Sequence, residues 1–300
     1  MLELQDLVAL DAAVTHAFST GDASGLEVLG YGEISAVVAC VSGGQSWACK
    51  RLPPFPGRAD ADRYSALFEE YLATLQARGV KVVPSMLQRL ARDDGRVVIY
   101  CVQPLLLAEQ LAVQILKRCS ELEARALFEA VFGRIVAAVS PQVGIDGQLS
   151  NWVVDGDDVA MLDVTTPMLK DAAGRNRLDM ELFLAAVPPP VRPLFRRYVV
   201  PSVVDKYHDP RGVTVDLIAN LTKESLESHM GPFLEIANRR LSQPIDAAEV
   251  RRYYAGDARV WTAWQALRRC DRFVRLNLLG QPYPFLLPGR IERHAARRPA

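Results

Sequence analysis

The chain has 300 residues, of which half are hydrophobic and 23% are charged, and its 35 basic residues balance its 35 acidic residues. This composition excludes an intrinsically disordered protein, because a chain of this length and hydrophobic content can bury a sizeable core in one large domain or in two smaller ones. The zero net charge argues against a general nucleic-acid binder and against a protein that binds membrane surfaces through charge.

The cysteine pattern, the N-terminal segment and the length of the apolar runs indicate the cellular compartment of the protein. Five cysteines are scattered among apolar residues without CxxC spacing, which indicates buried free thiols rather than disulfides or a zinc site. Residues 1–18 are typical of an amphipathic helix rather than a signal peptide. No apolar run approaches the roughly 18 residues that a membrane-spanning helix needs. We therefore expect a soluble, cytoplasmic protein that binds neither nucleic acid nor membrane.

The first third of the chain is expected to form mainly β-strands around one helix. Short apolar or alternating runs predict strands at residues 26–29, 36–41, 46–52, 82–90 and 96–102. Between them, the segment 60–78 carries apolar residues at spacings of three and four, and Gly79 follows it. This pattern predicts a helix that ends just before a C-terminal capping glycine.

The remainder is expected to be rich in helices, with one embedded hairpin. Helical periodicity marks residues 109–117 and 121–139, and short strands at 152–154 and 159–162 are joined by an Asp-Gly turn. A strand-rich part followed by a helical part predicts an α+β protein with two domains, residues 1–103 and 104–300. A cleft between two such domains is a usual place for a small-ligand site.

Two features of the strand-rich part are candidates for phosphate binding. Gly30 and Gly32 lie in the turn between the first two expected strands, where their backbone N–H groups could cradle a phosphate, although a plain turn is the commoner explanation. One strand later, Lys50 interrupts an apolar run and shares a face with Ala48 by strand alternation. A lysine on an edge strand that reaches solvent is the simpler alternative.

Three polar residues flank the hairpin and are not explained by its turn. Asn151 precedes the first strand and Asp163 follows the second, so the hairpin brings them close together. Two side-chain oxygens at such a place suit Mg²⁺, which fills the rest of its shell from phosphates and water. Asp146, a few residues upstream, is placed to orient an attacking hydroxyl or to accept its proton.

In this order, the motifs resemble the signature of the protein-kinase-like superfamily. The matching stretches are Gly30-x-Gly32-x-x-Ser35-x-Val37, Ala48-x-Lys50, Asp146-x4-Asn151 and Asp163. The catalytic stretch is most similar to the H-G-D-x-x-x-x-N loop of the aminoglycoside phosphotransferase and choline kinase relatives, which phosphorylate small molecules. The resemblance covers roughly residues 25–185 and implies a bilobal fold, with an antiparallel-sheet lobe before a mostly helical lobe.

The resemblance also implies ATP and Mg²⁺ as cofactors and a small-molecule hydroxyl as the acceptor. The residues implied to bind ATP are Gly30, Gly32, Ser35, Val37, Ala48, Lys50, Glu69, Val102 and Gln103. Lys50 would contact the phosphates and pair with Glu69 of the first-lobe helix. Asp146 would be the catalytic base, and Asn151 and Asp163 would hold the metal.

Departures from the family pattern leave alternatives open. Gly144 stands where the family has a histidine, and Val164 and Thr165 stand where protein kinases have Phe-Gly. The spacing of the helix could also place Phe68 rather than Glu69 opposite Lys50. These departures favour a nucleotide-binding pseudokinase with a regulatory role as the alternative, and nucleotidyl transfer is a third possibility. Residues 186–300 indicate no acceptor.

Overall fold

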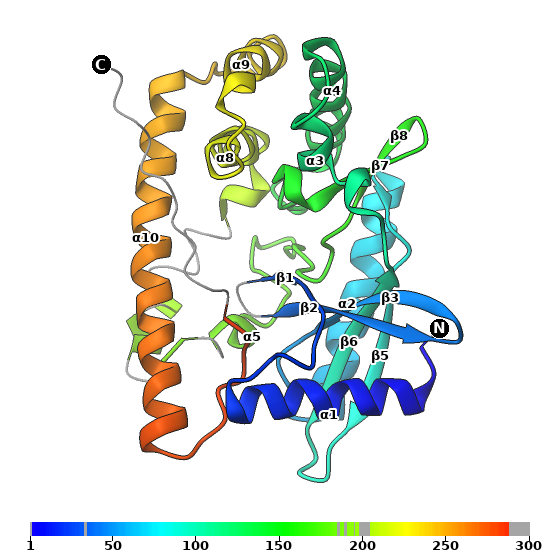
Figure 1. Ribbon diagram of the computed structural model, residues 1–300. Helices are drawn as coiled ribbons and strands as arrows, with labels where there is room; N and C mark the ends of the chain where they lie inside the picture. Colours follow the sequence, from blue (N-terminus) through cyan, green and yellow to red (C-terminus); the bar gives the residue numbers. More distant parts are fainter. Residues whose placement is uncertain are drawn as a thin grey trace.

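The fold is α+β, as the order of predicted strands and helices indicates. The computed structural model describes residues 2–32, 35–184, 187–188, 191–194, 196–197 and 205–287. Figure 1 shows an antiparallel sheet in one half of the molecule and a group of helices in the other, with the long helix α10 (Ala247–Phe273) running along one side.

The larger sheet has five strands, and each pair of neighbours is antiparallel. Its order is β1 (Val28–Tyr31), β2 (Ala36–Ser42), β3 (Gln45–Arg51), β6 (Val97–Pro104) and β5 (Met86–Ala91). The prediction of one strand over 82–90 is wrong. Pro84, which has no N–H to donate, separates β5 from the short strand β4 (Lys81–Val82), and β4 joins a second sheet.

Helices cover both faces of this sheet. Leu7, Leu10 and Val14 of α1 (Leu4–Thr20) pack against one face, where they meet Trp47 and Cys49 of β3. The helix α2 (Arg58–Ala77) packs against the other face. The division follows strand alternation, because odd and even residues of a strand point to opposite faces. Lys50 therefore points to the face that α2 covers.

A buried charged cluster fixes α1 to the sheet. Asp11 of α1 accepts hydrogen bonds from Arg51 Nε and from the Tyr100 hydroxyl, each at 3.0 Å, and forms an ion pair with Arg92. The side chains of Asp11 and Arg51 are only 6% and 8% exposed. Because a buried carboxylate needs several partners to offset the loss of hydration, this cluster specifies where α1 docks.

The helical half contains the other long helices and several short turns. The longer helices are α4 (Glu121–Ala138), α8 (Pro210–Lys223), α9 (Met230–Asn238) and α10. The shorter ones are η1 (Ala108–Gln110), α3 (Ala112–Leu116), η2 (Leu149–Asn151), α5 (Glu181–Leu184), α6 (Arg192–Leu194), η5 (Lys206–His208), η6 (Glu227–His229) and η7 (Val274–Leu278). The single helix expected at 109–117 is split, since Leu111 is extended between η1 and α3.

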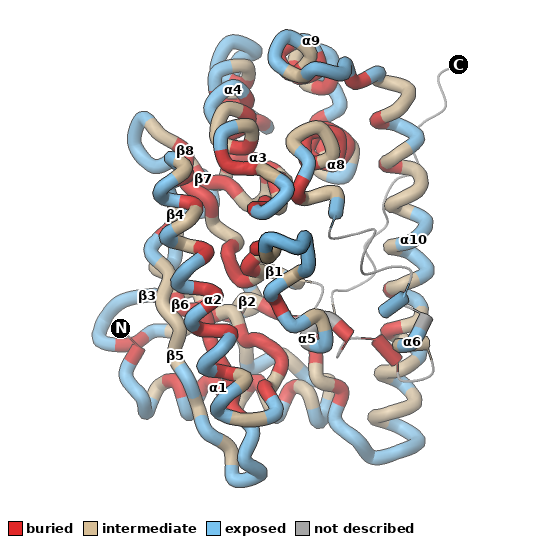
Figure 2. The backbone as a smooth tube through the Cα atoms, turned by 180° about the vertical axis from the view of Figure 1, so that it is seen from behind, coloured by how far each residue is buried: buried red, intermediate tan, exposed pale blue. Residues whose placement is uncertain are grey.

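Burial along α10 is uneven. Its N-terminal part packs against α8, and Val250 and Tyr254 are buried there. Further along, Trp264 packs against Tyr283 and Phe285. Figure 2 shows that much of the rest of this helix is half-buried or exposed.

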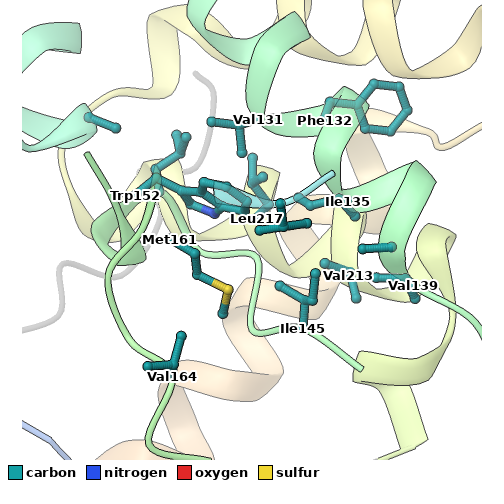
Figure 3. Close-up of a cluster of buried hydrophobic side chains, with 14 of the residues drawn as sticks. Val131, Phe132, Ile135, Val139, Ile145, Trp152, Met161, Val164, Val213 and Leu217 are labelled. Carbon is teal, nitrogen blue, oxygen red and sulfur yellow. The ribbon is translucent and has the colours of Figure 1, made fainter. Parts of the chain in front are cut away.

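The hairpin and the helices share one core, which lies directly beneath the candidate site. The hairpin strands are β7 (Trp152–Asp155) and β8 (Asp158–Met161), and β4 adds to β8 in parallel. Trp152 is fully buried among side chains of α4 and α8 (Figure 3). Ile145 and Val164 are also fully buried in this core. Ile145 precedes Asp146 and Val164 follows Asp163 in the chain. The core therefore fixes the backbone that carries both carboxylates.

Candidate functional site

The sheet and the hairpin meet at an ion pair between Lys50 and Asp163. The Lys50 Nζ atom lies 2.8 and 2.7 Å from the two carboxylate oxygens of Asp163. Asp163 also accepts hydrogen bonds from the backbone N–H and the hydroxyl of Thr165. Burial by itself would raise the pKa of Asp163, but the charge of Lys50 and these hydrogen bonds outweigh it and lower that pKa. Asp163 is therefore ionised at neutral pH.

Asp146 lies beside this pair and has a different electrostatic environment. Burial raises its pKa, and the negative charges of Asp216 and Asp163 raise it further. A hydrogen bond from the Gln148 N–H, at 3.3 Å, and the charge of Lys206 act in the opposite direction. The net result is a pKa of about 7, which is the range in which a carboxylate exchanges protons readily at neutral pH.

The hairpin also brings Asn151 next to Asp163. The backbone N–H of Leu162 donates to the Asn151 carbonyl at 2.8 Å, which makes Asn151 and Asp163 neighbours across the base of the hairpin. The Asn151 side-chain amide donates to the backbone carbonyl of Asp146 at 3.3 Å. The amide N–H is thus bound within the protein, and the amide oxygen is the atom of this side chain that could coordinate a cation.

The oxygens of Asn151 and Asp163 fit a Mg²⁺ ion that takes most of its ligands from phosphate and water. Among residues 2–32, 35–184 and the described parts beyond, no group of three or more His, Cys, Asp or Glu is placed to hold a metal. The described residues of this site therefore do not form a cage of His, Cys, Asp or Glu side chains around a metal ion. A hard cation shared with a phosphate-bearing ligand does fit the donor set.

Two buried tyrosines of α2 hold the backbone on either side of the carboxylates. The Tyr71 hydroxyl donates to the Gly144 carbonyl, and the Tyr64 hydroxyl donates to the Thr165 carbonyl, each at 2.9 Å. Burial, together with nearby negative charges, raises the pKa of both hydroxyls, so both remain protonated donors. The helix α2 thus ties the Asp146 loop and the Asp163 loop to the sheet.

Cross-strand pairing places several predicted ATP-binding residues on one face of the sheet. Lys50 lies opposite Val37 on one side and Cys101 on the other, and Ala48 lies opposite Gln103. Directly opposite residues of antiparallel strands share a face. Val37, Ala48, Lys50 and Gln103 are therefore all on the face that α2 covers.

The glycine loop is described except at its tip, because Glu33 and Ile34 lie outside the described residues. Gly32 donates its N–H to the Ser35 carbonyl at 2.8 Å, and a Cβ at Gly32 would lie 2.9 Å from the Ser35 hydroxyl. Ser35 is buried. A Cβ at Gly30 would meet nothing within 4 Å, so there is open space next to this backbone.

One of the residues expected to bind ATP needs correction, and the side chain of another points away from Lys50. Glu69 lies exposed on α2, and the carboxylate that Lys50 contacts is that of Asp163. The inner face of α2 carries buried Tyr64, Phe68 and Tyr71 instead. Val102 is fully buried in the cluster beneath α1, on the face opposite Lys50, so only its backbone, and not its side chain, could contact a nucleotide on the Lys50 face.

Gln103 does adjoin the hairpin. Its side-chain amide donates to the Leu162 carbonyl and to the Ser85 hydroxyl, each at 2.8 Å. Gln103 lies near the end of β6 and binds the residue that precedes Asp163, so this end of the sheet adjoins the hairpin.

The surroundings of Gly144 leave little room for a side chain at this position. A Cβ at this position would lie 3.0 Å from His208 Cε1, from Met168 Cβ and from the Tyr207 carbonyl oxygen. The buried side chain of His208, from η5, occupies the adjoining space. A larger residue at position 144 would therefore push against the backbone of η5.

Sequence patterns missed a second charged group beside Asp146. Lys206 of η5 forms an ion pair with Asp216 of α8 at 2.9 Å and donates to the Tyr253 hydroxyl of α10 at 2.8 Å. No motif links these residues, and they are joined only by the packing of three helical segments. The one available signal was that Lys206 is among the few lysines of the chain.

With this geometry established, the chain can be compared with known proteins. It belongs to the family described as "Family of unknown function (DUF6206)", whose model matches residues 9–272. No curated protein matches the chain significantly. Within the part of the chain that the structure describes, no helix is both long and apolar enough to cross a membrane.

Proposed function

We propose that this protein is an ATP- and Mg²⁺-dependent phosphotransferase that transfers a phosphoryl group to a hydroxyl of a small molecule. The proposal includes a bilobal, protein-kinase-like arrangement, with a sheet lobe over residues 1–103 and a helical lobe over residues 104–300. The observation that carries it is the meeting of Lys50, Asp163 and Asp146, which come from the sheet and from both sides of the hairpin.

The charges of these residues suit phosphoryl transfer, whose catalysis consists mainly of positioning and charge neutralisation. Lys50 supplies a cation on the sheet face that also carries Val37 and Ala48. Asp163 is ionised and partly exposed, so its carboxylate is available to a metal ion. When bound, ATP supplies the phosphoryl group and Mg²⁺ offsets the charge of its phosphates.

The proton of the acceptor hydroxyl goes to Asp146. Its pKa of about 7 leaves a substantial ionised fraction at neutral pH, and in its ionised form it is more basic than an ordinary aspartate. The N–H of Gln148 holds one of its oxygens, which leaves the other to face the acceptor. The tyrosine bonds to Gly144 and Thr165 hold the loop carrying the base at a fixed distance from the loop carrying the metal ligand.

An acceptor screen tests this function. ATP consumption would be measured with a panel of hydroxyl-bearing metabolites, for the wild type and for Asp146→Ala and Asp163→Ala. We expect turnover with at least one acceptor and a loss of at least 100-fold in each variant. Turnover that survives both substitutions would rule out this site.

One observation supports a second candidate, a nucleotide-binding pseudokinase. Lys50 is already neutralised by Asp163, and Glu69 is exposed and does not pair with it. A protein that keeps this ion pair would bind nucleotide without metal, or would not bind it. Thermal shift with ATP separates the two candidates, because only the phosphotransferase requires Mg²⁺ for the full stabilisation.

A further inference from the structure

A hydrogen-bonded network from the three helical segments η5, α8 and α10 lies next to the Asp146 loop. Its centre is Asp216, which is 2% exposed. One oxygen of Asp216 accepts from Lys206 Nζ at 2.9 Å and from the Tyr253 hydroxyl. The other accepts from the Gln148 side-chain amide at 3.2 Å. The Lys206 Nζ also donates to the Tyr253 hydroxyl at 2.8 Å, which closes a triangle.

This network contacts the Asp146 loop at two points. Gln148 binds Asp216 through its side chain and Asp146 through its backbone N–H, so a single residue links the two carboxylates. The Ile145 N–H donates to the Tyr207 carbonyl of η5 at 3.1 Å, next to Lys206. The residue before Asp146 and the residue two positions after it are therefore held by the segment that carries Lys206 and by its partner Asp216.

The network is charged and buried, which is costly for stability alone. Lys206 is 21% exposed, and burial by itself would lower its pKa, but Asp216 and Tyr253 hold that pKa above its usual range. Replacing a buried ion pair by apolar side chains is often neutral or stabilising. The charged pair is better explained here by its geometry. Lys206 and Tyr253 hold Asp216, and Asp216 in turn holds the side chain of Gln148 in the loop next to Asp146.

We propose that Lys206, Asp216 and Tyr253 form a positioning network that orients Asp146 through Gln148. It deepens the proposed phosphotransferase function and rests on it where catalysis is concerned. The network gives the C-terminal part of the chain a role at the site, because Tyr253 belongs to α10. Lys206 and Asp216 act through Gln148 and the loop and do not themselves need to contact substrate.

Kinetics test the proposal in the full-length protein. Lys206→Met and Asp216→Asn should each lower kcat by roughly 10- to 100-fold, because a small misplacement of a catalytic group costs about that much. The KM for ATP should stay within about threefold, since the network does not reach the sheet face that carries Lys50. Lys206→Arg should recover part of the loss, and Lys206→Met combined with Asp216→Asn should cost little more than either alone.

The matched control is Glu249→Gln. Glu249 of α10 forms a two-pronged ion pair with Arg211 of α8, at 2.8 and 2.7 Å, and so joins the same two helices outside the network. We expect this variant to change kcat by less than about twofold. An equal loss of kcat in Glu249→Gln and Asp216→Asn would show that docking of α10 in general matters, and would overturn the proposal.

A second measurement does not depend on activity. Hydrogen exchange of the amides in residues 144–151 should become at least about fivefold faster in Asp216→Asn and Lys206→Met but not in Glu249→Gln, with exchange in α4 unchanged. Unchanged exchange in Asp216→Asn would overturn the network whether or not the protein is active. A wild type without any turnover, combined with a loosened loop in the variants, would instead refute the proposed function and keep the network.

Discussion

Lys50 and Asp163 lie 113 positions apart in the chain and meet at 2.7 to 2.8 Å, which makes their ion pair the direct link between β3 and the base of the hairpin. Lys50 is 16% exposed and Asp163 is 36% exposed, so the pair is partly shielded from water but still reachable. A ligand that carries both a metal ion and phosphates matches the two partners separately, with the metal on Asp163 and the phosphates on Lys50.

This pairing predicts how nucleotide binding depends on metal. At saturation, ATP with Mg²⁺ should raise the Tm of the wild type by about 5–10 °C, and ATP alone should raise it much less. Asp163→Asn should abolish the difference that Mg²⁺ makes, whereas Lys50→Met should weaken both responses. Asp155→Asn is the control, because it breaks only the exposed pair with Lys81 at the hairpin turn. A full response in Asp163→Asn would contradict the metal role of Asp163.

The raised pKa of Asp146 predicts the pH dependence of turnover. A general base must be ionised to accept a proton, so kcat/KM should fall as the pH drops below about 7 and reach a plateau above it. Because the charge of Asp216 contributes to the shift, Asp216→Asn should move the apparent pKa of the profile downward. A profile that follows the ordinary aspartate value of 3.8 would show that Asp146 is not the group that titrates.

The cluster around Asp11 predicts a large loss of stability from one substitution. Asp11→Ala leaves the buried guanidinium of Arg51 without its carboxylate and should lower the free energy of unfolding by about 3–5 kcal/mol. Urea denaturation measures this change. Asp62→Ala removes an exposed ion pair with Arg89 and should cost less than about 1 kcal/mol. Similar losses in the two variants would show that Asp11 does not anchor α1.

The packing at Gly144 predicts that a single methyl group is harmful there. In Gly144→Ala the new Cβ would meet the Tyr207 backbone at 3.0 Å, and overpacking of this kind costs about 1–3 kcal/mol. The same change at Gly256, which lies in α10 with open space around it, should stabilise the protein by about 0.5–1 kcal/mol. Thermal unfolding of both variants checks the opposite signs. A stabilised Gly144→Ala would mean that η5 does not pack against position 144.

Much of the fold could be predicted from local pattern. The apolar spacing of residues 60–78 predicts α2, which runs from Arg58 to Ala77, and the Asp-Gly turn predicts the hairpin that joins β7 to β8. Strand alternation places Lys50 and Ala48 on one face of β3, which the pairing confirms. These features depend on residues close together in the chain, where periodicity and turn chemistry decide the outcome.

The wrong prediction at Glu69 and the points that the sequence left open concern contacts that depend on packing between distant segments. Glu69 and Phe68 differ by about 100° around α2, and only the packed helix shows that Phe68 faces inward. Val102 belongs to a strand that is apolar on both faces, so its sequence could not tell the face toward α1 from the face toward the site. Lys206 and Tyr253 meet only because η5 and α10 both dock on α8, and no local pattern encodes that.

Label transfer tests the central claim most directly. The protein would be incubated with Mg²⁺, a metabolite extract and ATP labelled either at the γ-phosphate or at the α-phosphate. We predict that the γ-label alone appears in a small-molecule product, and that Asp146→Asn abolishes the transfer while ATP still raises its Tm. Transfer of the α-label would indicate nucleotidyl transfer instead. No transfer of either label, with metal-independent ATP binding, would contradict the assignment of a phosphotransferase.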